Sequence, residues 1–304
     1  MRSIHLTSSG ELVEKDVPQP QLHVGEVLIR VHAAGVTPTE LQWYPTSHTR
    51  DGEIRRNVVL AHEFSGEIAA ANGDVGDLSI GQNIYGLNDW FEDGALAEYC
   101  VTKPASIALK PQSLTHAEAG SVPIGALTAW QAYKHVGLKS GERLLVQGAA
   151  GGVGIFAIQF ARLRGAYVIA TASKHNLDFV RNLGADEVLD YRAGPFEKKV
   201  SNIDVVLDAV GGDTLARSWG VLKSNGRLVT VAADSEGTAD QRSKKAFLLV
   251  KPDREQLIEI GNLIDTGKVQ PVVDTVVPLS RASDAYAGKL KQHVRGKIVI
   301  SVVD

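Results

Sequence analysis

The segment that most constrains the fold is "RLLVQGAAGGVGIFAIQFARLRG", residues 143–165, in which an apolar run, a glycine-rich turn and an amphipathic stretch follow one another. Residues 144–147 predict a buried strand. The residues that share one face of the following helix are Val153, Phe156, Ala157, Phe160 and Ala161. Strand, glycine turn and helix in this order are the context in which a dinucleotide binds, and they disfavour the alternative of a glycine turn without a ligand.

The glycines of this turn have separate roles in such a site. Gly151 lets the backbone approach a pyrophosphate, Gly154 lets the helix pack against the sheet, and the helix N-terminus receives the anion. Ala149 stands where the usual GxGxxG pattern has its first glycine, so the match is imperfect. The predicted cofactor-binding residues of the loop are Ala149, Gly151, Gly152, Val153 and Gly154.

The end of the second strand indicates which nicotinamide cofactor fits. An NAD site carries an acidic residue about 20 residues after the glycines, where it holds the ribose hydroxyls. Here the strand ends in Ala172, Ser173 and Lys174, so no carboxylate would repel a 2′-phosphate. The lysine charge and the serine hydroxyl suit NADPH, which is the predicted cofactor. The alternative is a helix-capping serine followed by a solvated lysine.

The rest of the chain divides around this unit. Before about residue 113, short runs such as "EVLIRVHAAGV" alternate with period two and are broken by glycine, asparagine and aspartate, which predicts a mainly β domain. Thr115 and Glu118 then have the spacing of a capping box. Strands alternate with helices up to "GRLVTVA", which predicts an α/β fold with a doubly wound parallel sheet. Two more helical segments precede a last strand, "GKIVISVV".

Composition excludes several classes of function. The net charge of -3 gives no basic surface for nucleic acid, and no apolar run is long enough to cross a membrane. Cys100 is the only cysteine, so no disulfide can form within the chain. The first residues lack the apolar core of a signal peptide. We therefore expect a cytoplasmic protein that acts on a small molecule.

Several motifs, in order, resemble the medium-chain dehydrogenase/reductase superfamily: "GAAGGVGIFAIQFARLRGAYVIATAS", "NLGADEVLDYR", "DVVLDAVGGDTL" and "RGKIVI". They are most similar to its zinc-independent quinone oxidoreductase branch. The resemblance spans nearly the whole chain and implies a GroES-like catalytic domain (residues 1–122), a Rossmann domain (123–249) and a C-terminal segment (250–304) that completes the catalytic domain. It places the active site in the cleft between the domains. It also implies a homodimer joined at Rossmann sheet edges, near "GRLVTVA" and "AFLLV".

The resemblance assigns further cofactor residues in the Rossmann part of the chain. Tyr191 would join Ser173 and Lys174 around the 2′-phosphate, and Thr128 would lie near the nicotinamide. The residues implied to line the ribose and nicotinamide channel are Val210, Val231, Ala232 and Phe247.

The stretch "LAHEFSG" raises the question of a metal. In the zinc alcohol dehydrogenases of the superfamily, the histidine that matches His62 is a zinc ligand, and the two other protein ligands match Thr37 and Ile124. Isoleucine cannot bind zinc and a threonine hydroxyl replaces thiolate poorly, whereas a catalytic zinc needs three protein ligands. We therefore expect no metal, and we expect His62 and Glu63 to form a hydrogen-bonded pair in the cleft.

A cleft without a metal favours conjugated acceptors. Hydride addition to a simple ketone makes an alkoxide, whereas addition to a quinone or an α,β-unsaturated carbonyl makes a phenolate or enolate whose charge is spread by conjugation. Candidate hydrogen-bond donors in "GVTPTELQWY" are Thr37, Gln42 and Tyr44, and candidates to line the cleft are Trp43, His62 and Trp90. Ordinary packing is the alternative for the tyrosine and the tryptophans. The resembled quinone reductases have asparagine in place of Thr37 and tyrosine in place of Gln42.

Three functions remain open. The first is NADPH-dependent reduction of quinones or enones without a metal. The second is reduction or dehydrogenation of ordinary carbonyls and alcohols within the same superfamily, with a weakly bound metal. The third is NADPH binding in a structural or regulatory role with little turnover.

Overall fold

The computed structural model describes residues 1–290 and 295–303 and divides into two compact units. The first, here called the mixed-sheet unit, comprises residues 1–127, 251–290 and 297–303. The second, the parallel-sheet unit, comprises residues 128–250 with 295 and 296. Helix α3 (Pro123–Val136) crosses from one to the other, whereas the sequence places this boundary at its first residue.

The parallel-sheet unit is built on five parallel strands in the order β11-β10-β9-β12-β13. They are β9 (Arg143–Gln147), β10 (Tyr167–Ala172), β11 (Glu187–Asp190), β12 (Ile203–Asp208) and β13 (Leu222–Thr230). The direction of winding reverses beside β9, and ligands of open α/β sheets bind at such a switch point. The predicted doubly wound sheet is confirmed.

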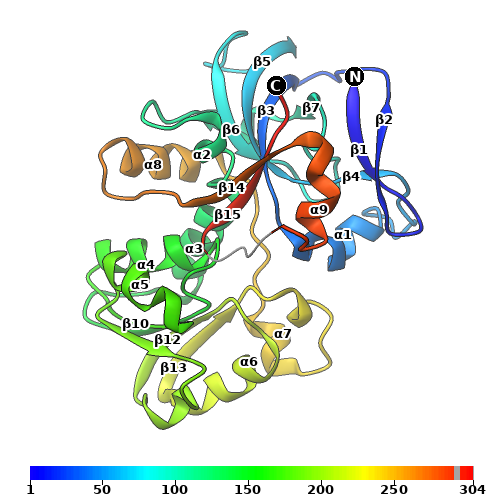
Figure 1. Ribbon diagram of the computed structural model, residues 1–304. Helices are drawn as coiled ribbons and strands as arrows, with labels where there is room; N and C mark the ends of the chain where they lie inside the picture. The colour runs from blue at the N-terminus through cyan, green and yellow to red at the C-terminus, as the bar shows by residue number, and fades with distance from the viewer. Residues whose placement is uncertain (291–294, 304) are drawn as a thin grey trace. The chain divides into compact units, whose positions relative to one another are not determined.

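Helices cover this sheet, as Figure 1 shows. Helices α4 (Gly154–Leu163) and α5 (Leu177–Asn182) pack against β9, β10 and β11. Helices α6 (Gly212–Ser218) and α7 (Gln241–Ala246) pack against β12 and β13. Four residues of the predicted face, Phe156, Ala157, Phe160 and Ala161, are buried, whereas Val153 precedes the helix and is only partly buried. Ile155 and Ile158, which were not predicted, are buried as well. The helix is therefore enclosed on more sides than an amphipathic surface helix.

The mixed-sheet unit contains a seven-stranded sheet in the order β14-β15-β3-β5-β6-β8, in which β7 also pairs with β3, and a three-stranded sheet in the order β2-β1-β4. The strands are β1 (Arg2–Leu6), β2 (Leu12–Asp16), β3 (Glu26–Gly35), β4 (Val58–Val59), β5 (Glu63–Asn72), β6 (Asn83–Leu87), β7 (Tyr99–Thr102), β8 (Ile107–Leu109), β14 (Val273–Pro278) and β15 (Lys297–Ser301). Strand β15 runs antiparallel to β3, with Ser301 opposite Ala33. The last described strand thus belongs to the sheet of the first part of the chain (Figure 1).

The core of the mixed-sheet unit lies on this seven-stranded sheet. Ile29, Phe64, Ile84 and Ile300 are fully buried there. The helices of the unit are α1 (Tyr44–Ser47), α2 (His116–Ala119), α8 (Arg254–Asp265) and α9 (Ala282–Tyr286). Helix α2 begins with the capping box predicted from Thr115 and Glu118, in which each side chain bonds the backbone amide of the other residue.

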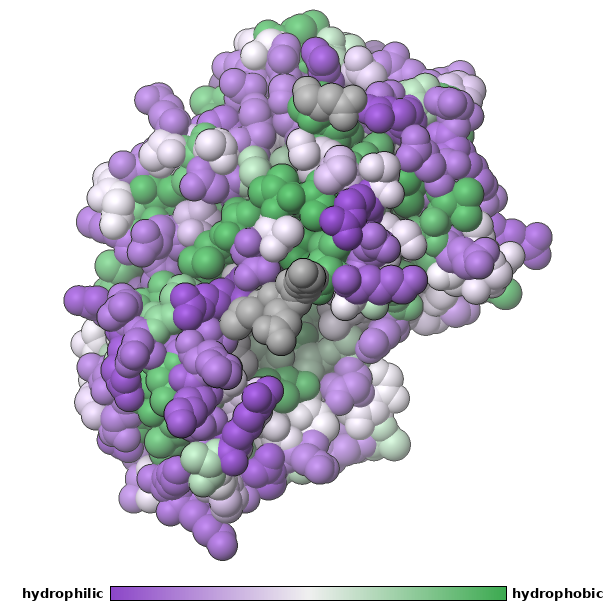
Figure 2. Space-filling model, in the orientation of Figure 1, coloured by the Kyte–Doolittle hydropathy of each residue, from purple (hydrophilic) through white to green (hydrophobic). Residues whose placement is uncertain are grey.

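Hydrophilic side chains cover most of the face drawn in Figure 2, with hydrophobic side chains between them. No helix among the described residues is long and apolar enough to cross a membrane. Strand β13 forms one edge of the parallel sheet, and Phe247 bridges to its last residue, Thr230. The homodimer expected through this edge stays a prediction.

Candidate cofactor and active site

Every strand of the parallel sheet ends beside a residue that was predicted to bind the cofactor. Because the carboxyl ends of parallel strands meet at one edge, these residues share that edge of the sheet. They are the loop from Ala149 to Gly154 after β9, Ser173 and Lys174 after β10, Tyr191 after β11, Val210 after β12, and Val231 and Ala232 after β13. Phe247 joins them through its bridge to Thr230, and Thr128 is buried in α3.

The glycine loop has the shape that a pyrophosphate needs. A Cβ atom on Gly154 would lie 2.4 Å from the carbonyl oxygen of Gly148, so the fold itself requires this glycine. A Cβ on Gly151 would approach the same oxygen only to 3.4 Å, an ordinary contact. No side chain caps the start of α4, where the amides of Ile155 and Ala157 donate to the carbonyl oxygens of Gly151 and Val153. The positive end of the helix dipole at such an N-terminus favours an anion. The loop fits a dinucleotide phosphate.

Three of the residues predicted to surround the 2′-phosphate lie at the end of β10. Ser173 precedes the 3₁₀ helix η3 (Lys174–Asn176), but its hydroxyl makes no capping bond and accepts only a 3.4 Å bond from Asn176 Nδ2. The alternative of a helix-capping serine is therefore not what the structure shows. Lys174 is exposed. The amide of Tyr191 donates to Ala172 O at 3.2 Å, which holds the half-exposed tyrosine beside the same strand end.

Arg295 is a further residue at this edge that the sequence reasoning missed. Its Nε donates to Asn176 Oδ1 at 2.9 Å and its Nη2 to His175 O at 3.1 Å. The amide of Gly296 donates to Ala150 O at 2.8 Å in the glycine loop. The guanidinium therefore adds a positive charge beside His175, the residue that follows Lys174. The signal was the "RGK" triplet at the start of the last strand, where a cation, Arg295, comes directly before the glycine.

In the mixed-sheet unit, Thr37 belongs to a buried polar network. Lys297 Nζ donates to Thr37 Oγ1 at 2.9 Å and lies 2.7 Å from Glu63 Oε1. Glu63 Oε2 accepts the amide of Ile124 at 2.8 Å, at the start of α3. Burial raises the pKa of the Glu63 carboxyl, and the Lys297 ammonium acts in the opposite direction.

The expected pair of His62 and Glu63 is wrong. His62 Nδ1 lies 3.0 Å from Glu40 Oε2, and its Nε2 lies 3.1 Å from the carbonyl oxygen of Glu92. Glu63 opens strand β5, where successive side chains point to opposite faces, so the two neighbours in sequence reach different partners. Glu40 Oε2 also accepts the amide of Ala61, and both carboxylates are fully buried.

The remaining predicted residues lie around 3₁₀ helix η1 (Pro38–Gln42) and α1. Trp43 contacts Trp90 edge to face at 4.6 Å between ring centroids, and Trp90 lies 4.8 Å from the ring of His62. All three are buried, so they offer little surface to a substrate in this state. Gln42 and Tyr44 are exposed, and the tyrosine stacks on His48 at 4.3 Å. The roles of all five predicted residues stay predictions.

The side chains at the zinc positions of the superfamily do not fit a catalytic zinc. Both ring nitrogens of His62 face acceptor oxygens, and residue 124 is an isoleucine. The Lys297 ammonium beside Thr37 Oγ1 would repel a divalent cation at that oxygen. Over residues 1–290 and 295–303, no three His, Cys, Asp or Glu side chains are grouped to hold a metal ion.

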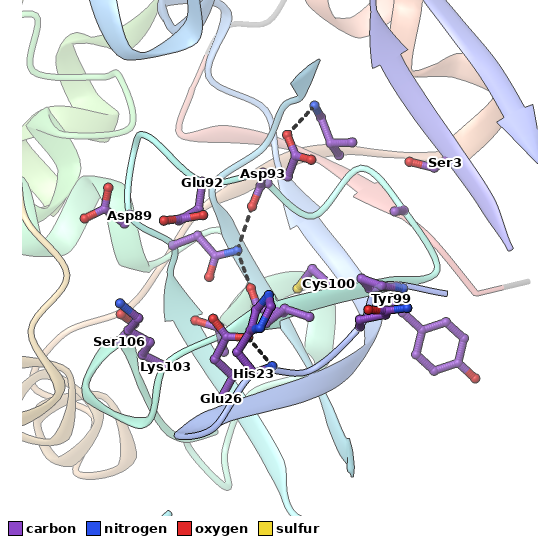
Figure 3. Close-up of a pocket in the computed structure, with 18 of the residues that line it drawn as sticks. Ser3, His23, Glu26, Asp89, Glu92, Asp93, Tyr99, Cys100, Lys103 and Ser106 are labelled. Carbon is purple, nitrogen blue, oxygen red and sulfur yellow. Dashed lines mark hydrogen bonds between the residues drawn. The ribbon is translucent and has the colours of Figure 1, made fainter. Parts of the chain in front are cut away.

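A separate cavity of about 490 Å³ lies within the mixed-sheet unit (Figure 3). Asp89, Glu92 and Asp93 line it from the loop after β6, and His23 and Glu26 line it from the start of β3. The His23 amide donates to Glu26 Oε2 at 2.9 Å, one of the bonds drawn in Figure 3. Among the described residues that line this cavity, none is a predicted catalytic or cleft residue.

Comparison with known proteins agrees with this arrangement. Two family models match: alcohol dehydrogenase GroES-like domain over residues 23–112, and zinc-binding dehydrogenase over residues 183–300. The NAD(P)H oxidoreductase RTN4IP1, mitochondrial, of Danio rerio is 32% identical, with 95% of this chain and 87% of that protein covered. The chloroplast envelope quinone oxidoreductase homolog of Arabidopsis thaliana is 31% identical, with 95% and 93% covered.

Solved structures give the same result. The structure of the quinone oxidoreductase from Coxiella burnetii matches with a TM-score of 0.89 and 30% identity, covering 100% of this chain and 99% of that one. The chain belongs to the medium-chain dehydrogenase/reductase superfamily, among its quinone oxidoreductase-type members. It is an NAD(P)H-dependent oxidoreductase, with a GroES-like unit in the mixed sheet and a Rossmann unit in the parallel sheet. Because some relatives are mitochondrial or chloroplastic, the expected cytoplasmic location stays a prediction.

Proposed function

We propose that the protein transfers hydride from NADPH to a quinone or an α,β-unsaturated carbonyl compound without a metal. The observation that carries this proposal is the donor set in the mixed-sheet unit. At the positions where the zinc dehydrogenases of the superfamily have ligands, this chain has a threonine hydroxyl bonded to a buried ammonium and a histidine whose nitrogens are both engaged. Such a set can donate hydrogen bonds, but it supplies no Lewis acid.

The choice of NADPH over NADH is supported by the end of β10. The position after the second strand has no carboxylate, because Ala172 is followed by Ser173 and Lys174. Lys174 and Arg295 supply two positive charges there, and the serine hydroxyl and Tyr191 supply polar groups. A 2′-phosphate gains charge-assisted hydrogen bonds in such surroundings, whereas a ribose hydroxyl gains little.

The chemistry divides simply between cofactor and protein. NADPH would supply the hydride, and the glycine loop and the N-terminus of α4 would hold its pyrophosphate. The protein has to orient the acceptor and to donate hydrogen bonds to the oxygen on which charge develops. Thr37, Gln42 and Tyr44 are the proposed donors. Since conjugation spreads the charge of a phenolate or enolate, one or two such donors are sufficient.

Two relatives support the substrate class by their names. One is the chloroplast quinone oxidoreductase homolog described above. The other is the 2-methylene-furan-3-one reductase of Solanum lycopersicum, which is 30% identical, with 95% of this chain and 74% of that protein covered. The named substrate of the second carries a C=C bond conjugated to a carbonyl group.

The test is transfer of deuterium from NADPH labelled on one face of the nicotinamide. We expect the label to appear at one stereospecific position of an enone product, and a quinone panel to be reduced at the same time. Label transfer to simple ketones with no reaction of conjugated acceptors would favour the carbonyl reductase alternative. Tight NADPH binding without transfer to any acceptor would favour a non-catalytic role.

A further inference from the structure

We propose that Lys297 is a positioning residue, which fixes the Thr37 hydroxyl as a hydrogen-bond donor to the substrate oxygen. The inference rests on the proposed function, because it concerns the reaction at Thr37. It adds a residue that lies 260 positions away in sequence and that no local motif connects to the site.

The ammonium of Lys297 is buried beside a carboxylate. The residue is only 7% exposed, and a buried charge needs a partner of opposite sign. Glu63, which is fully buried, supplies this partner at 2.7 Å. Its second oxygen is fixed by the amide of Ile124, so the carboxylate cannot turn away. A Cβ on Gly35 would lie 2.4 Å from Glu63 Oε1, so the glycine two residues before Thr37 makes room for the ion pair.

The bond from Lys297 settles which role the threonine hydroxyl can play. A hydroxyl has one proton and two lone pairs, and by itself it can turn to donate or to accept. An ammonium has no lone pair, so Thr37 Oγ1 can only accept from it, at 2.9 Å. The hydroxyl proton therefore points elsewhere. Among the described residues, the structure shows no acceptor for that proton, and Thr37 is only half buried.

This arrangement suits an oxygen that becomes negative during the reaction. A hydroxyl that accepts a charge-assisted bond is polarised, so its own proton makes a stronger bond to the next acceptor. The bond strengthens as hydride addition places charge on the substrate oxygen, which lowers the barrier more than it improves binding of the substrate. Loss of Lys297 should therefore appear in kcat rather than in KM.

A double-mutant cycle tests whether Lys297 acts through Thr37. Thr37→Val and Lys297→Met should each lower kcat with a quinone or an enone about 10- to 100-fold, with KM for that acceptor and for NADPH each changed less than about 2-fold. If Lys297 acts only through Thr37, kcat of the double variant should be no more than about 3-fold lower than kcat of the slower single variant. Thr37→Ser, which keeps the hydroxyl, should retain at least about a third of native kcat.

Two further variants serve as controls for the double-mutant cycle. Lys110→Met removes another lysine of the same unit, whose ammonium donates to the carbonyl oxygens of Pro111 and Leu114, and it should keep kcat within about 2-fold of native. If Lys297→Met alone unfolds because Glu63 loses its partner, Glu63→Gln with Lys297→Met removes both charges and takes its place in the cycle.

The outcomes separate the two proposals. If the native protein turns over no conjugated acceptor, the proposed function fails and this inference fails with it. If the native protein turns over and the effects of Thr37→Val and Lys297→Met multiply in full, only the positioning role is overturned. Native kcat in a folded Lys297→Met variant would overturn it as well.

Discussion

His116 stacks on His32 in the mixed-sheet unit, with ring centroids 4.2 Å apart and ring planes inclined by 19°. His116 Nδ1 lies 2.8 Å from Ser65 Oγ, and that hydroxyl donates to the carbonyl oxygen of Ile84. Burial lowers the pKa of His116 to about 4, with smaller contributions from His32 and Lys110. Burial also lowers the pKa of His32, followed by the charge of Arg30.

The histidine pair predicts a loss of stability in mild acid. The His116 pKa falls from 6.5 to about 4 on folding, so between these values the unfolded chain binds a proton there that the folded chain does not. Above about pH 6.5 the titration of His116 should not change the free energy of unfolding. Between about pH 6.5 and 4 this titration should make the free energy of unfolding decrease as the pH drops. His116→Gln should flatten the dependence of Tm on pH between 7.5 and 4.5. The exposed His135→Gln should leave it as in the native protein, and a native Tm that does not vary over this range would contradict the prediction.

The glycine loop predicts two different losses from two similar substitutions. Gly154→Ala places a Cβ 2.4 Å from Gly148 O, so it should destabilise the fold by about 1–3 kcal/mol, measured by denaturant unfolding. Gly151→Val has room for its Cβ in the protein and should stay folded, but it should lose NADPH binding because its methyl groups fill the phosphate path. Equal NADPH affinity in Gly151→Val and the native protein would show that the pyrophosphate lies elsewhere.

The charges at the end of β10 predict cofactor preference. NADPH should bind at least ~10-fold tighter than NADH, about 1.4 kcal/mol. Lys174→Glu should remove or reverse that ratio, and Arg295→Ala should reduce it. Lys198→Glu makes the same charge change at an exposed site after Pro195 and should leave the ratio unchanged. Isothermal titration with both cofactors gives the ratios, and equal dissociation constants in the native protein would count against this assignment.

The side chains at the zinc positions predict activity without a metal. The purified protein should contain far less than one zinc per chain by elemental analysis, and turnover should be unchanged after dialysis against a chelator. The reason is that Thr37 Oγ1 faces an ammonium and both nitrogens of His62 face oxygen atoms. Stoichiometric zinc whose removal stops turnover would overturn this prediction.

The exposed donors predict graded rather than complete losses of activity. Gln42→Ala and Tyr44→Phe should each lower kcat by about 10- to 100-fold, about 1.4–2.7 kcal/mol of transition-state stabilisation. Affinity for NADPH should change little, because both residues belong to the mixed-sheet unit. Ser47→Ala, an exposed change in the same short helix, is the control. If neither variant slows turnover, Thr37 remains the single candidate donor among the three.

The fold could be predicted from the sequence where local patterns determine it. The glycine loop, the alternation of strands and helices, and the capping box of Thr115 each depend on residues close in sequence, and the structure has them all. The reversal of strand order at β9 follows from the same doubly wound pattern.

The network around Thr37 could not be predicted, because its partners are distant in sequence. His62 and Glu63 look like a pair as neighbours, but the extended chain points them to opposite faces. Glu63 then meets Lys297 and His62 meets Glu40. Arg295 was missed for a similar reason, since its contacts to Asn176 and His175 join the last strand region to η3.

The pairing of β3 with β15 also has a consequence for synthesis. Ala33 leaves the ribosome long before Ser301, its partner in the sheet. At a rate of synthesis of about 5–20 residues per second, β15 is made on the order of 10–50 s after β3. The strands of the parallel sheet lie between residues 143 and 230, so they can pair with one another while β3 still waits. During this interval the nascent chain can hold one completed sheet while the edge of β3 at Ala33–Gly35 is still unpaired.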